Sequence, residues 1–440
     1  MVRPSGSIRG GKFAFAWAVS LRKTCSDTFK NHDEVLRAGL RCALLLLMLS
    51  GCSASLHLLA AQSAIPAAPL ENLKATQIPA SLFGMTLISG TAWPTVSVGA
   101  LGKGTGVNWP YIEPPKNIFN WDRLDAWMRL AEHNRVDFFY SNDLVPPWAA
   151  ADPKSCRPTY PGSQVVGCTS TVADPQDWDR FVTALATRYR GRMIYELWNE
   201  PYTHSFTGTV DDMVVLTTHE YRIVRAVDPR ALILAPSGTS AYMDRYFAAG
   251  GPTGVDVVTF HSYQSTPEAV IRDAFAMTEV ATKYGLATKP IWDTEGAWST
   301  VPDTLTADQQ SSFLARMYLL LWSQGVSRFY WYAWDSAAFG SLWSSARGSS
   351  SAAHAYAQVY EWMVGATMDR PCLQAQDATW TCTLSRPGGY RALAVWNSSA
   401  TKSYEPTASY RFYLDLAGEK HRVNAAVTVG SQPILFVDAP

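Results

Sequence analysis

Eight apolar runs of strand length alternate with amphipathic segments of helical period along the central part of this chain. The expected strands are 82–87, 104–109, 136–141, 193–199, 231–235, 255–261, 290–294 and 328–334. The expected helices are 121–134, 175–189, 211–227, 267–284 and 306–324, and the first and fifth connections are the least helical in pattern. Strands that alternate with helices pair in parallel. Eight such units predict a closed (β/α)8 TIM barrel, over residues 80–365, rather than an open sheet.

Composition and charge exclude some classes of function. Lys and Arg number 37, as do Asp and Glu, so the net charge is +0 and no basic stripe is present to neutralise phosphates. Nucleic acid is therefore not an expected partner. No glycine-rich loop follows an expected strand, which disfavours a nucleotide-binding α/β fold. Aromatic residues make up 12% of the chain, a richness that favours a glycan site mildly, because indole and phenol rings stack on sugars.

The helical period disappears after residue 365. Short strand patterns at 390–396, 410–416 and 433–437 are separated by Gly, Pro, Asn and Ser. This pattern predicts a small antiparallel, β-sandwich-like domain over residues 366–440. It contains no catalytic constellation, and we favour a structural cap over a carbohydrate-binding module.

The N-terminal region has the pattern of an export signal. Arg37 and Arg41 precede an apolar run at 43–49, which is too short to span a bilayer as a helix. The run ends in Leu-Ser-Gly-Cys and resembles a bacterial lipobox, which implies a lipid on Cys52. Ser53 after this cysteine implies sorting to the outer membrane. The alternative is an ordinary signal cleaved near residues 61–64.

We therefore expect a leader with an upstream extension over residues 1–62 and a tether over 63–79. The protein is expected to be exported as an outer-membrane lipoprotein, or otherwise to be periplasmic or secreted. Its membrane contact would be the N-terminal lipid alone, and the oligomeric state is not predicted.

Four of the seven cysteines lie beyond the leader. They form two pairs close in sequence, Cys156 with Cys168 and Cys372 with Cys382. In an exported protein such pairs predict local disulfides. Neither pair has neighbouring His or Cys ligands, so no structural metal is expected.

Two expected strands end in a glutamate. Glu200 is followed by Pro201, which cannot continue a sheet ladder, and Glu295 is followed by Gly296. The 95 residues between the glutamates correspond to three βα units of about 30 residues. That spacing places them at the ends of strands four and seven, which face each other across the mouth of the barrel.

Two facing carboxylates suit glycosidic bond cleavage. Retention of configuration needs one carboxylic acid at the leaving oxygen and one carboxylate that attacks the anomeric carbon, about 5 to 5.5 Å apart. Asn199 can bond the sugar 2-hydroxyl beside Glu200. Glu196 and Asp293 share strand faces with these glutamates but lie deeper, so we interpret them as structural.

The sequence Trp-Asn-Glu-Pro at 198–201, with Thr-Glu-Gly at 294–296, resembles glycoside hydrolase clan A, the retaining (β/α)8 glycosidases. This resemblance implies that Glu200 is the acid/base and Glu295 the nucleophile. His261 and Tyr263 match the His-x-Tyr sequence of the clan at strand six. Tyr263 would then hold the nucleophile ionised, and Trp334 would be a sugar platform at strand eight.

Within the clan, residues 107–114 and 119–122 are similar to family 39, with its xylosidases and exopolysaccharide hydrolases. Trp109 and Trp148 are added as candidate sugar-binding aromatics. Family 5 is the near alternative, although its members usually place a histidine after strand three, where this chain has Asn142-Asp143.

The resemblance implies a retaining β-glycoside hydrolase that cleaves oligo- or polysaccharides by double displacement without a cofactor. Two alternatives stay open: a catalytically weak glycan-binding lipoprotein, and a transglycosylase that uses the same glutamates. The sugar, and exo or endo action, are not predicted. The long segment 146–174, stapled by its cysteine pair, is expected to shape the cleft.

Overall fold

The computed structural model describes residues 76–90, 93–299, 304–336 and 340–438. The leader, most of the tether and Cys52 lie outside these ranges. Within the described ranges, no helix has the length and hydropathy needed to cross a membrane.

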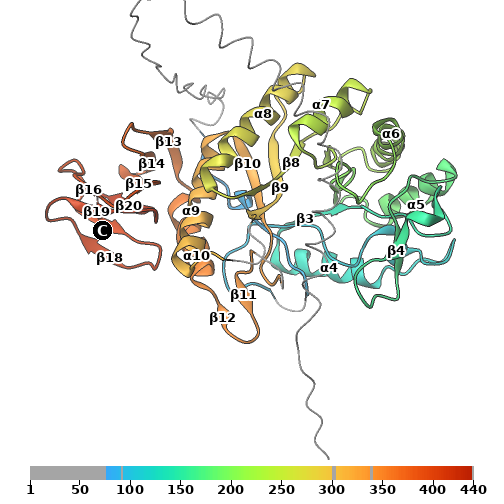
Figure 1. The fold of residues 1–440 in the computed structure, drawn as a ribbon, viewed down its shortest axis with the longest axis horizontal. Helices are drawn as coiled ribbons and strands as arrows, with labels where there is room; N and C mark the ends of the chain where they lie inside the picture. The colour runs from blue at the N-terminus through green and yellow to red at the C-terminus, as the bar shows by residue number, and fades with distance from the viewer. Residues whose placement is uncertain (1–75, 91–92, 300–303, 337–339, 439–440) are drawn as a thin grey trace, which may run out of the picture. The chain divides into compact units, whose positions relative to one another are not determined.

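Eight parallel strands form the central sheet (Figure 1). They are β1 (Phe83–Met85), β2 (Ala100–Leu101), β3 (Asp137–Ser141), β6 (Ile194–Glu196), β7 (Ile233–Leu234), β8 (Val258–Gln264), β9 (Ile291–Trp298) and β10 (Val326–Trp331). Their order is β7-β6-β3-β2-β1-β10-β9-β8. A parallel bridge from Leu234 to Val257 joins the two outer strands, and Ala235 N donates to Val257 O at 2.9 Å. The sheet is nearly closed, which confirms the predicted TIM barrel.

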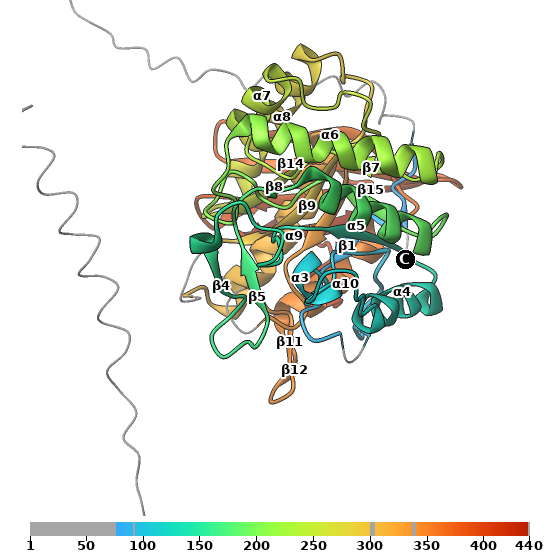
Figure 2. The same ribbon diagram turned by 90° about the vertical axis from the view of Figure 1, so that its right-hand side faces the viewer.

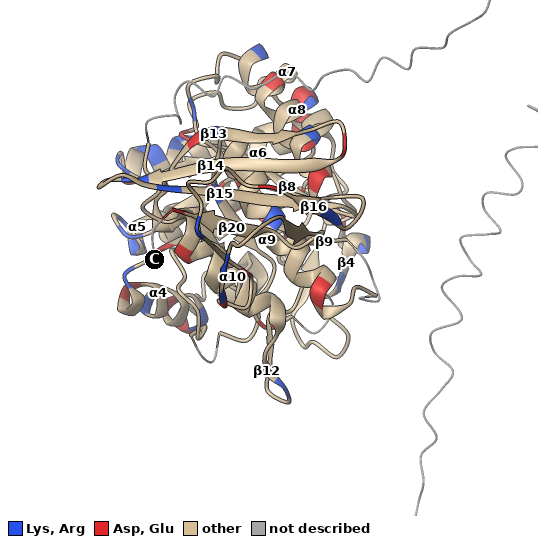
Figure 3. Cartoon of the chain, turned by 90° about the vertical axis from the view of Figure 1, so that its left-hand side faces the viewer, with Lys and Arg blue, Asp and Glu red and all other residues tan. Residues whose placement is uncertain are grey.

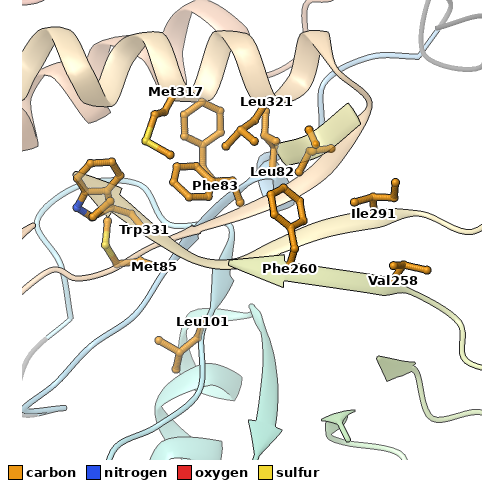
Figure 4. Packing of buried hydrophobic residues seen from close by; sticks show 14 of the residues in the cluster. Leu82, Phe83, Met85, Leu101, Val258, Phe260, Ile291, Met317, Leu321 and Trp331 are labelled. Atoms are coloured by element: carbon orange, nitrogen blue, oxygen red, sulfur yellow. The ribbon is translucent and has the colours of Figure 1, made fainter. Parts of the chain in front are cut away.

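Helices cover the outside of the strands (Figures 1 and 2). They are α4 (Asp122–Asn134), α5 (Pro175–Arg188), α6 (Val210–Val227), α7 (Ser240–Ala248), α8 (Val270–Lys283), α9 (Ala307–Ser323) and α10 (Ser351–Met363). Their starts follow from local sequence: Thr209 and Thr306 each make a capping box. Met317 and Leu321 of α9 lie over Phe83 and Trp331 of the sheet (Figure 4).

The second strand was predicted wrongly. It is β2 at Ala100–Leu101, whereas Trp109, at the end of the predicted strand, begins the short helix α3 (Trp109–Ile112). Pro110 at the start of this helix cannot donate to a sheet ladder but fits a first helical turn. The prediction also ended strand seven at Thr294, whereas β9 continues to Trp298.

Gly296 therefore lies inside β9 and does not end it. A Cβ at this position would lie 2.6 Å from Ser262 O and 2.9 Å from the ring of Phe329. Only a glycine lets β9 approach β8 and β10 this closely.

Two small hairpins belong to loops that follow barrel strands. β4 (Cys156–Pro158) pairs with β5 (Val166–Cys168) after β3, and the disulfide Cys156–Cys168 staples them, as predicted. β11 (Trp343–Ser344) pairs with β12 (Gly348–Ser349) after β10. The disulfide therefore joins two points of the long segment after strand three.

The C-terminal region is an antiparallel β domain, as predicted. Its six-stranded sheet contains β13 (Thr367–Gln374), β14 (Thr379–Arg386), β15 (Tyr390–Asn397), β20 (Ile434–Val437), β17 (Phe412–Leu414) and β18 (Lys420–Arg422). A smaller pair, β16 (Lys402–Tyr404) with β19 (Val427–Val429), accompanies it. The second predicted disulfide, Cys372–Cys382, is also present. Acidic and basic residues are interspersed on the side that carries this sheet (Figure 3).

The core of the barrel continues into the C-terminal sheet. Trp380 and Trp396 stack at 5.6 Å and belong to the same apolar cluster as the barrel residues. Ser312 Oγ on α9 donates to Ser431 O at 2.6 Å, and Cys372 N donates to Ser323 Oγ at 2.8 Å. This shared core supports our interpretation of the domain as a structural cap.

Replacing Gly296 with alanine is expected to lower the free energy of unfolding by about 1–3 kcal/mol, because the added Cβ overpacks β8 and β10. Urea denaturation measures this change. Gly430→Ala is the control, since its Cβ would meet only Thr401 Oγ1, at 3.6 Å. Equal effects of the two substitutions would contradict the packing argument.

Candidate active site

Glu200 lies just beyond the end of β6, as the sequence predicted. The backbone N–H of Asn199 donates to Asn142 O at 2.9 Å and so continues the pairing with the chain after β3. At Glu200 the chain turns, with φ at 49°. A left-handed conformation is uncommon in a residue other than glycine, and such positions cluster at functional sites. Ser237 Oγ accepts the N–H of Glu200 at 3.2 Å.

The Glu200 side chain contacts a histidine and a tyrosine. Its Oε1 lies 2.8 Å from His261 Nδ1 and accepts a hydrogen bond from Tyr202 Oη at 3.1 Å. Burial raises the pKa of Glu200, but the hydrogen bond and charge of His261 outweigh it, so that the pKa falls to about 2. Burial lowers the pKa of His261, while the charges of Glu295 and Glu200 raise it above its ordinary value of 6.5. The two groups therefore form a charged pair.

Glu295 on β9 is the more buried of the two glutamates, with its side chain 10% exposed against 23% for Glu200. Tyr263 Oη donates to Glu295 Oε1 at 2.6 Å, and Lys103 Nζ lies 2.7 Å from Oε2. Burial raises the pKa of Glu295, but the charges of Lys103 and His261 outweigh it, and the pKa is lowered. Glu295 is thus held ionised.

The two glutamates face each other closely. One carboxylate oxygen of each, together with a His261 ring nitrogen, lies within 4.8 Å of the others. Retaining glycosidases place their carboxyl groups about 5–5.5 Å apart, whereas inverting enzymes leave about 6.5–9.5 Å for a water. A closest approach of at most 4.8 Å fits the shorter spacing of the retaining arrangement better than the longer one.

A bulge in β9 sets the position of Glu295. Pairing with β8 passes from Phe260–Asp293 to His261–Glu295 and so skips Thr294. Thr294 Oγ1 instead donates to Glu196 Oε1 at 2.7 Å inside the barrel. Bulges near active sites change the direction in which a side chain points. Simple strand alternation could not have predicted this register.

The inner acids are buried and hydrogen-bonded within the barrel. Glu196 accepts the bond from Thr294, and Ser262 Oγ donates to Asp293. Burial raises the pKa of Glu196 and of Asp293, which favours their neutral forms. Both contacts support our interpretation of these acids as structural.

Lys103 is a site residue that the sequence analysis missed. It follows β2 by two residues, and its Nζ donates to Asn199 Oδ1 as well as contacting Glu295. Burial lowers the pKa of Lys103, but the charges of Glu295 and Asp143 raise it further, so the ammonium stays charged. The sequence analysis placed a strand at 104–109, so Lys103 was expected before that strand, at the end of the barrel opposite the mouth. Lys103 was therefore not considered as a site residue.

Of the two aromatic residues that follow β10, Tyr332 lies near the glutamates and Trp334 does not. Tyr332 is partly exposed, contacts the ring of Tyr263 edge-on at 6.3 Å, and has a pKa raised by burial and by the charge of Glu295. Trp334 is only 3% exposed, and its backbone N–H donates to Thr86 O at 2.9 Å. A buried indole offers no face to a sugar, so the prediction for Trp334 is corrected.

Trp109 is likewise corrected, because it is 0% exposed. Its ring packs on Trp148 and Phe181, and its indole N–H donates to Glu113 Oε2 at 2.8 Å. Trp148 is partly exposed and lies beneath the cation of Arg180. A sugar contact by Trp148 stays a prediction.

One set of acids and histidine in the described ranges has the proximity of a metal-ligand group: Glu200, His261 and Glu295. The ammonium of Lys103 already supplies positive charge beside Glu295. The expectation that the site needs no metal or cofactor stays a prediction.

One family model matches the middle of the chain. The family model described as Cellulase (glycosyl hydrolase family 5) matches residues 166–336, which is less than half of the chain. No curated protein matches the sequence.

Several solved structures share the fold. One is a family 39 glycoside hydrolase from the gut symbiont Bacteroides cellulosilyticus WH2, with 16% identity, a TM-score of 0.65, and coverage of 82% of this chain and 81% of that one. A family 39 β-xylosidase from Caulobacter crescentus has 14% identity, a TM-score of 0.58 and coverage of 83% and 98%. A family 30 subfamily 8 xylanase from Clostridium acetobutylicum has 12% identity, a TM-score of 0.56 and coverage of 81% and 95%.

The fold and the matched family model define the class of protein: the chain is a glycosidase. The family 5 model confirms the resemblance to clan A, and the similar family 39 and family 30 structures share the fold. The match is too short to assign the chain to family 5.

The charged pair of Glu200 and His261 predicts how stability depends on pH. A lowered pKa makes the contribution of Glu200 complete above pH 4.5 and lost as the pH falls toward 2. The raised pKa of His261 makes its contribution complete below pH 6.5 and lost at higher pH. The free energy of unfolding of the parent should therefore be higher than that of Glu200→Gln, and the difference should be largest between pH 4.5 and 6.5. Urea denaturation from pH 3 to 9 measures the difference, and a constant difference would refute the pair.

Replacing Lys103 with methionine removes the cation beside Glu295, so the pKa of Glu295 should rise. The acidic limb of kcat/KM against pH should move upward by roughly one unit, because an attacking carboxylate must be ionised. Lys103→Arg keeps the charge and should leave the limb near its original position. An unchanged limb in the methionine variant would contradict the role of Lys103.

Proposed function

We propose that the protein is an exported retaining β-glycoside hydrolase that cleaves a β-linked oligo- or polysaccharide by double displacement. Glu295 is the nucleophile and Glu200 the acid/base. The observation that carries this proposal is the separation of at most 4.8 Å between facing oxygens of two carboxylates in different environments.

In the first step Glu295 attacks the anomeric carbon, while the leaving oxygen takes a proton from Glu200. Tyr263 and Lys103 hold Glu295 ionised and oriented before attack. In the second step Glu200 takes a proton from water, whose oxygen attacks the anomeric carbon and releases Glu295. The glutamates supply both reacting groups, so the proposal includes no cofactor.

The proton that Glu200 must donate is shared with His261. In the free site the pKa of Glu200 is lowered and that of His261 is raised, so the charged form of the pair dominates. A sugar in the cleft excludes water, and loss of water favours neutral groups over charged ones. Binding therefore moves the proton across the 2.8 Å contact from Nδ1 to Oε1, where the leaving oxygen needs it.

Two groups are placed to bind the sugar. Asn199 accepts from Lys103 through Oδ1, which leaves its amide N–H groups to donate to the sugar 2-hydroxyl. Tyr332 presents a partly exposed ring near both glutamates, as its electrostatic contacts indicate. Two of the similar structures are named a β-xylosidase and a xylanase, so an aryl β-xyloside is the first substrate to test.

We also propose export to the outer membrane through a lipid on Cys52, with a periplasmic or secreted protein as the alternative. The leader sequence supports this location, as do the two disulfides, which form in oxidising compartments.

Glu295→Gln should lower kcat for aryl β-glycosides by about 10³-fold or more, because the attacking group is lost. Glu200→Gln should slow substrates with poor leaving groups most, since activated leaving groups need little protonation. Glu279→Gln, an exposed glutamate on α8, is the control and should leave kcat unchanged.

NMR of the first product formed should show the β anomer. An α product would refute retention, and full turnover by Glu295→Gln would refute the nucleophile. Sugar transfer to an acceptor in place of hydrolysis would identify a transglycosylase. Binding without any turnover by the parent would identify a glycan-binding protein.

A further inference from the structure

A third carboxylate, that of Asp143, interacts electrostatically with the two glutamates. It follows β3, whose last residue pairs with Glu196 at the end of β6. The side chain of the preceding residue, Asn142, bonds to the backbone at both of its polar atoms. Its Oδ1 accepts from Trp109 N at 2.9 Å, and its Nδ2 donates to Leu144 O at 3.0 Å. The chain at Asp143 is therefore held in place independently of its own side chain.

The charges that act on Asp143 belong to the candidate active site. They are those of Lys103, Glu295 and Glu200, and Asp143 in turn acts on Tyr332. Burial and the two glutamates raise the pKa of Asp143 to about 6, against the lowering effect of Lys103. Asp143 thus shares the cleft with the reacting groups.

One oxygen of this carboxylate lacks a hydrogen-bond donor. Oδ1 of Asp143 is buried, and it accepts no hydrogen bond from any residue that the structure describes. One oxygen of Asp293 and one of Glu220 share this property, but those residues are 0% and 1% exposed, whereas Asp143 is partly exposed and within reach of a substrate. A buried acceptor without a donor is unfavourable, which indicates that the donor comes with the substrate.

The charge balance of the cleft restricts that substrate. Three carboxylates, those of Glu200, Glu295 and Asp143, face two cations, Lys103 and protonated His261. Both cations are already engaged, Lys103 by Glu295 and Asn199, and His261 by Glu200. A sugar carboxylate would have to displace Glu295 from Lys103 and would be repelled by Asp143. A hydroxyl donor satisfies Asp143 without either penalty.

We propose that Asp143 is a specificity-determining residue that accepts a hydrogen bond from a hydroxyl of a neutral sugar and excludes uronic acids from the cleft. This inference rests on the proposed hydrolase and names its substrate class.

The test compares three aryl β-glycosides: the xyloside, the glucoside and the glucuronide, the last two differing only in the group at C6. The parent should prefer the neutral sugars. In Asp143→Asn, kcat/KM for the glucuronide relative to the glucoside should rise about tenfold or more, because like charges in a cleft discriminate strongly. Asp143→Glu keeps the charge and should keep the preference.

Asp211→Asn, an exposed site on α6, is the control for a lost charge and should leave the ratio unchanged. A parent that prefers the glucuronide would overturn the proposal. So would an equal loss on all three substrates in Asp143→Asn, since a merely structural role lowers activity without changing the ratio.

Binding separates this proposal from the proposed hydrolysis. Tryptophan fluorescence measures the affinity of the matching S-linked aryl glycosides, which resist hydrolysis, for the parent and for Asp143→Asn. A preference for the neutral sugars that only the Asp143→Asn variant loses supports the role of Asp143, even if the parent hydrolyses none of the O-linked glycosides. Failure to bind either neutral sugar, or equal selectivity in both proteins, overturns it.

Discussion

The candidate active site depends on the contact between the Lys103 ammonium and Glu295, at 2.7 Å. Two carboxylates within 4.8 Å of each other in a partly buried cleft repel, and burial opposes the ionisation of both. Lys103 compensates Glu295, and His261 compensates Glu200. Each glutamate thus has its own cation, and the two cations differ in kind. A lysine fixes the charge of the nucleophile, whereas a histidine can give its proton up. This difference is what assigns the two glutamates their roles in our proposal.

The ends of the parallel barrel strands position these groups. Parallel strands end at the same rim, so residues far apart in sequence meet there. Two departures from regular structure complete the arrangement: the left-handed backbone at Glu200 and the bulge that skips Thr294 in β9. Gly296 allows β9 to stay close to its neighbours through the bulge. The C-terminal sheet shares the apolar core with α9 and covers that side of the barrel.

The alternation of strands and helices was enough to predict the barrel, because hydrophobic period reports directly on burial. The spacing of Glu200 and Glu295 likewise placed them correctly on strands four and seven. What failed depended on interactions distant in sequence. The two-residue strand β2 is too short for a periodic signal, and its misplacement concealed Lys103. Trp334 and Tyr332 are both aromatic residues near the end of one strand, and only the fold shows which is buried. No sequence pattern indicates that the Oδ1 atom of Asp143 lacks a hydrogen-bond donor.

The proposed mechanism requires a covalent bond between Glu295 and the sugar. A 2-deoxy-2-fluoro aryl β-glycoside slows the second step more than the first, so a glycosyl-enzyme accumulates. Peptide mass spectrometry after incubation locates the added sugar. We expect one sugar per chain, on the peptide that contains Glu295. A sugar on Glu200 or Asp143, or turnover with inversion and no adduct, would contradict it.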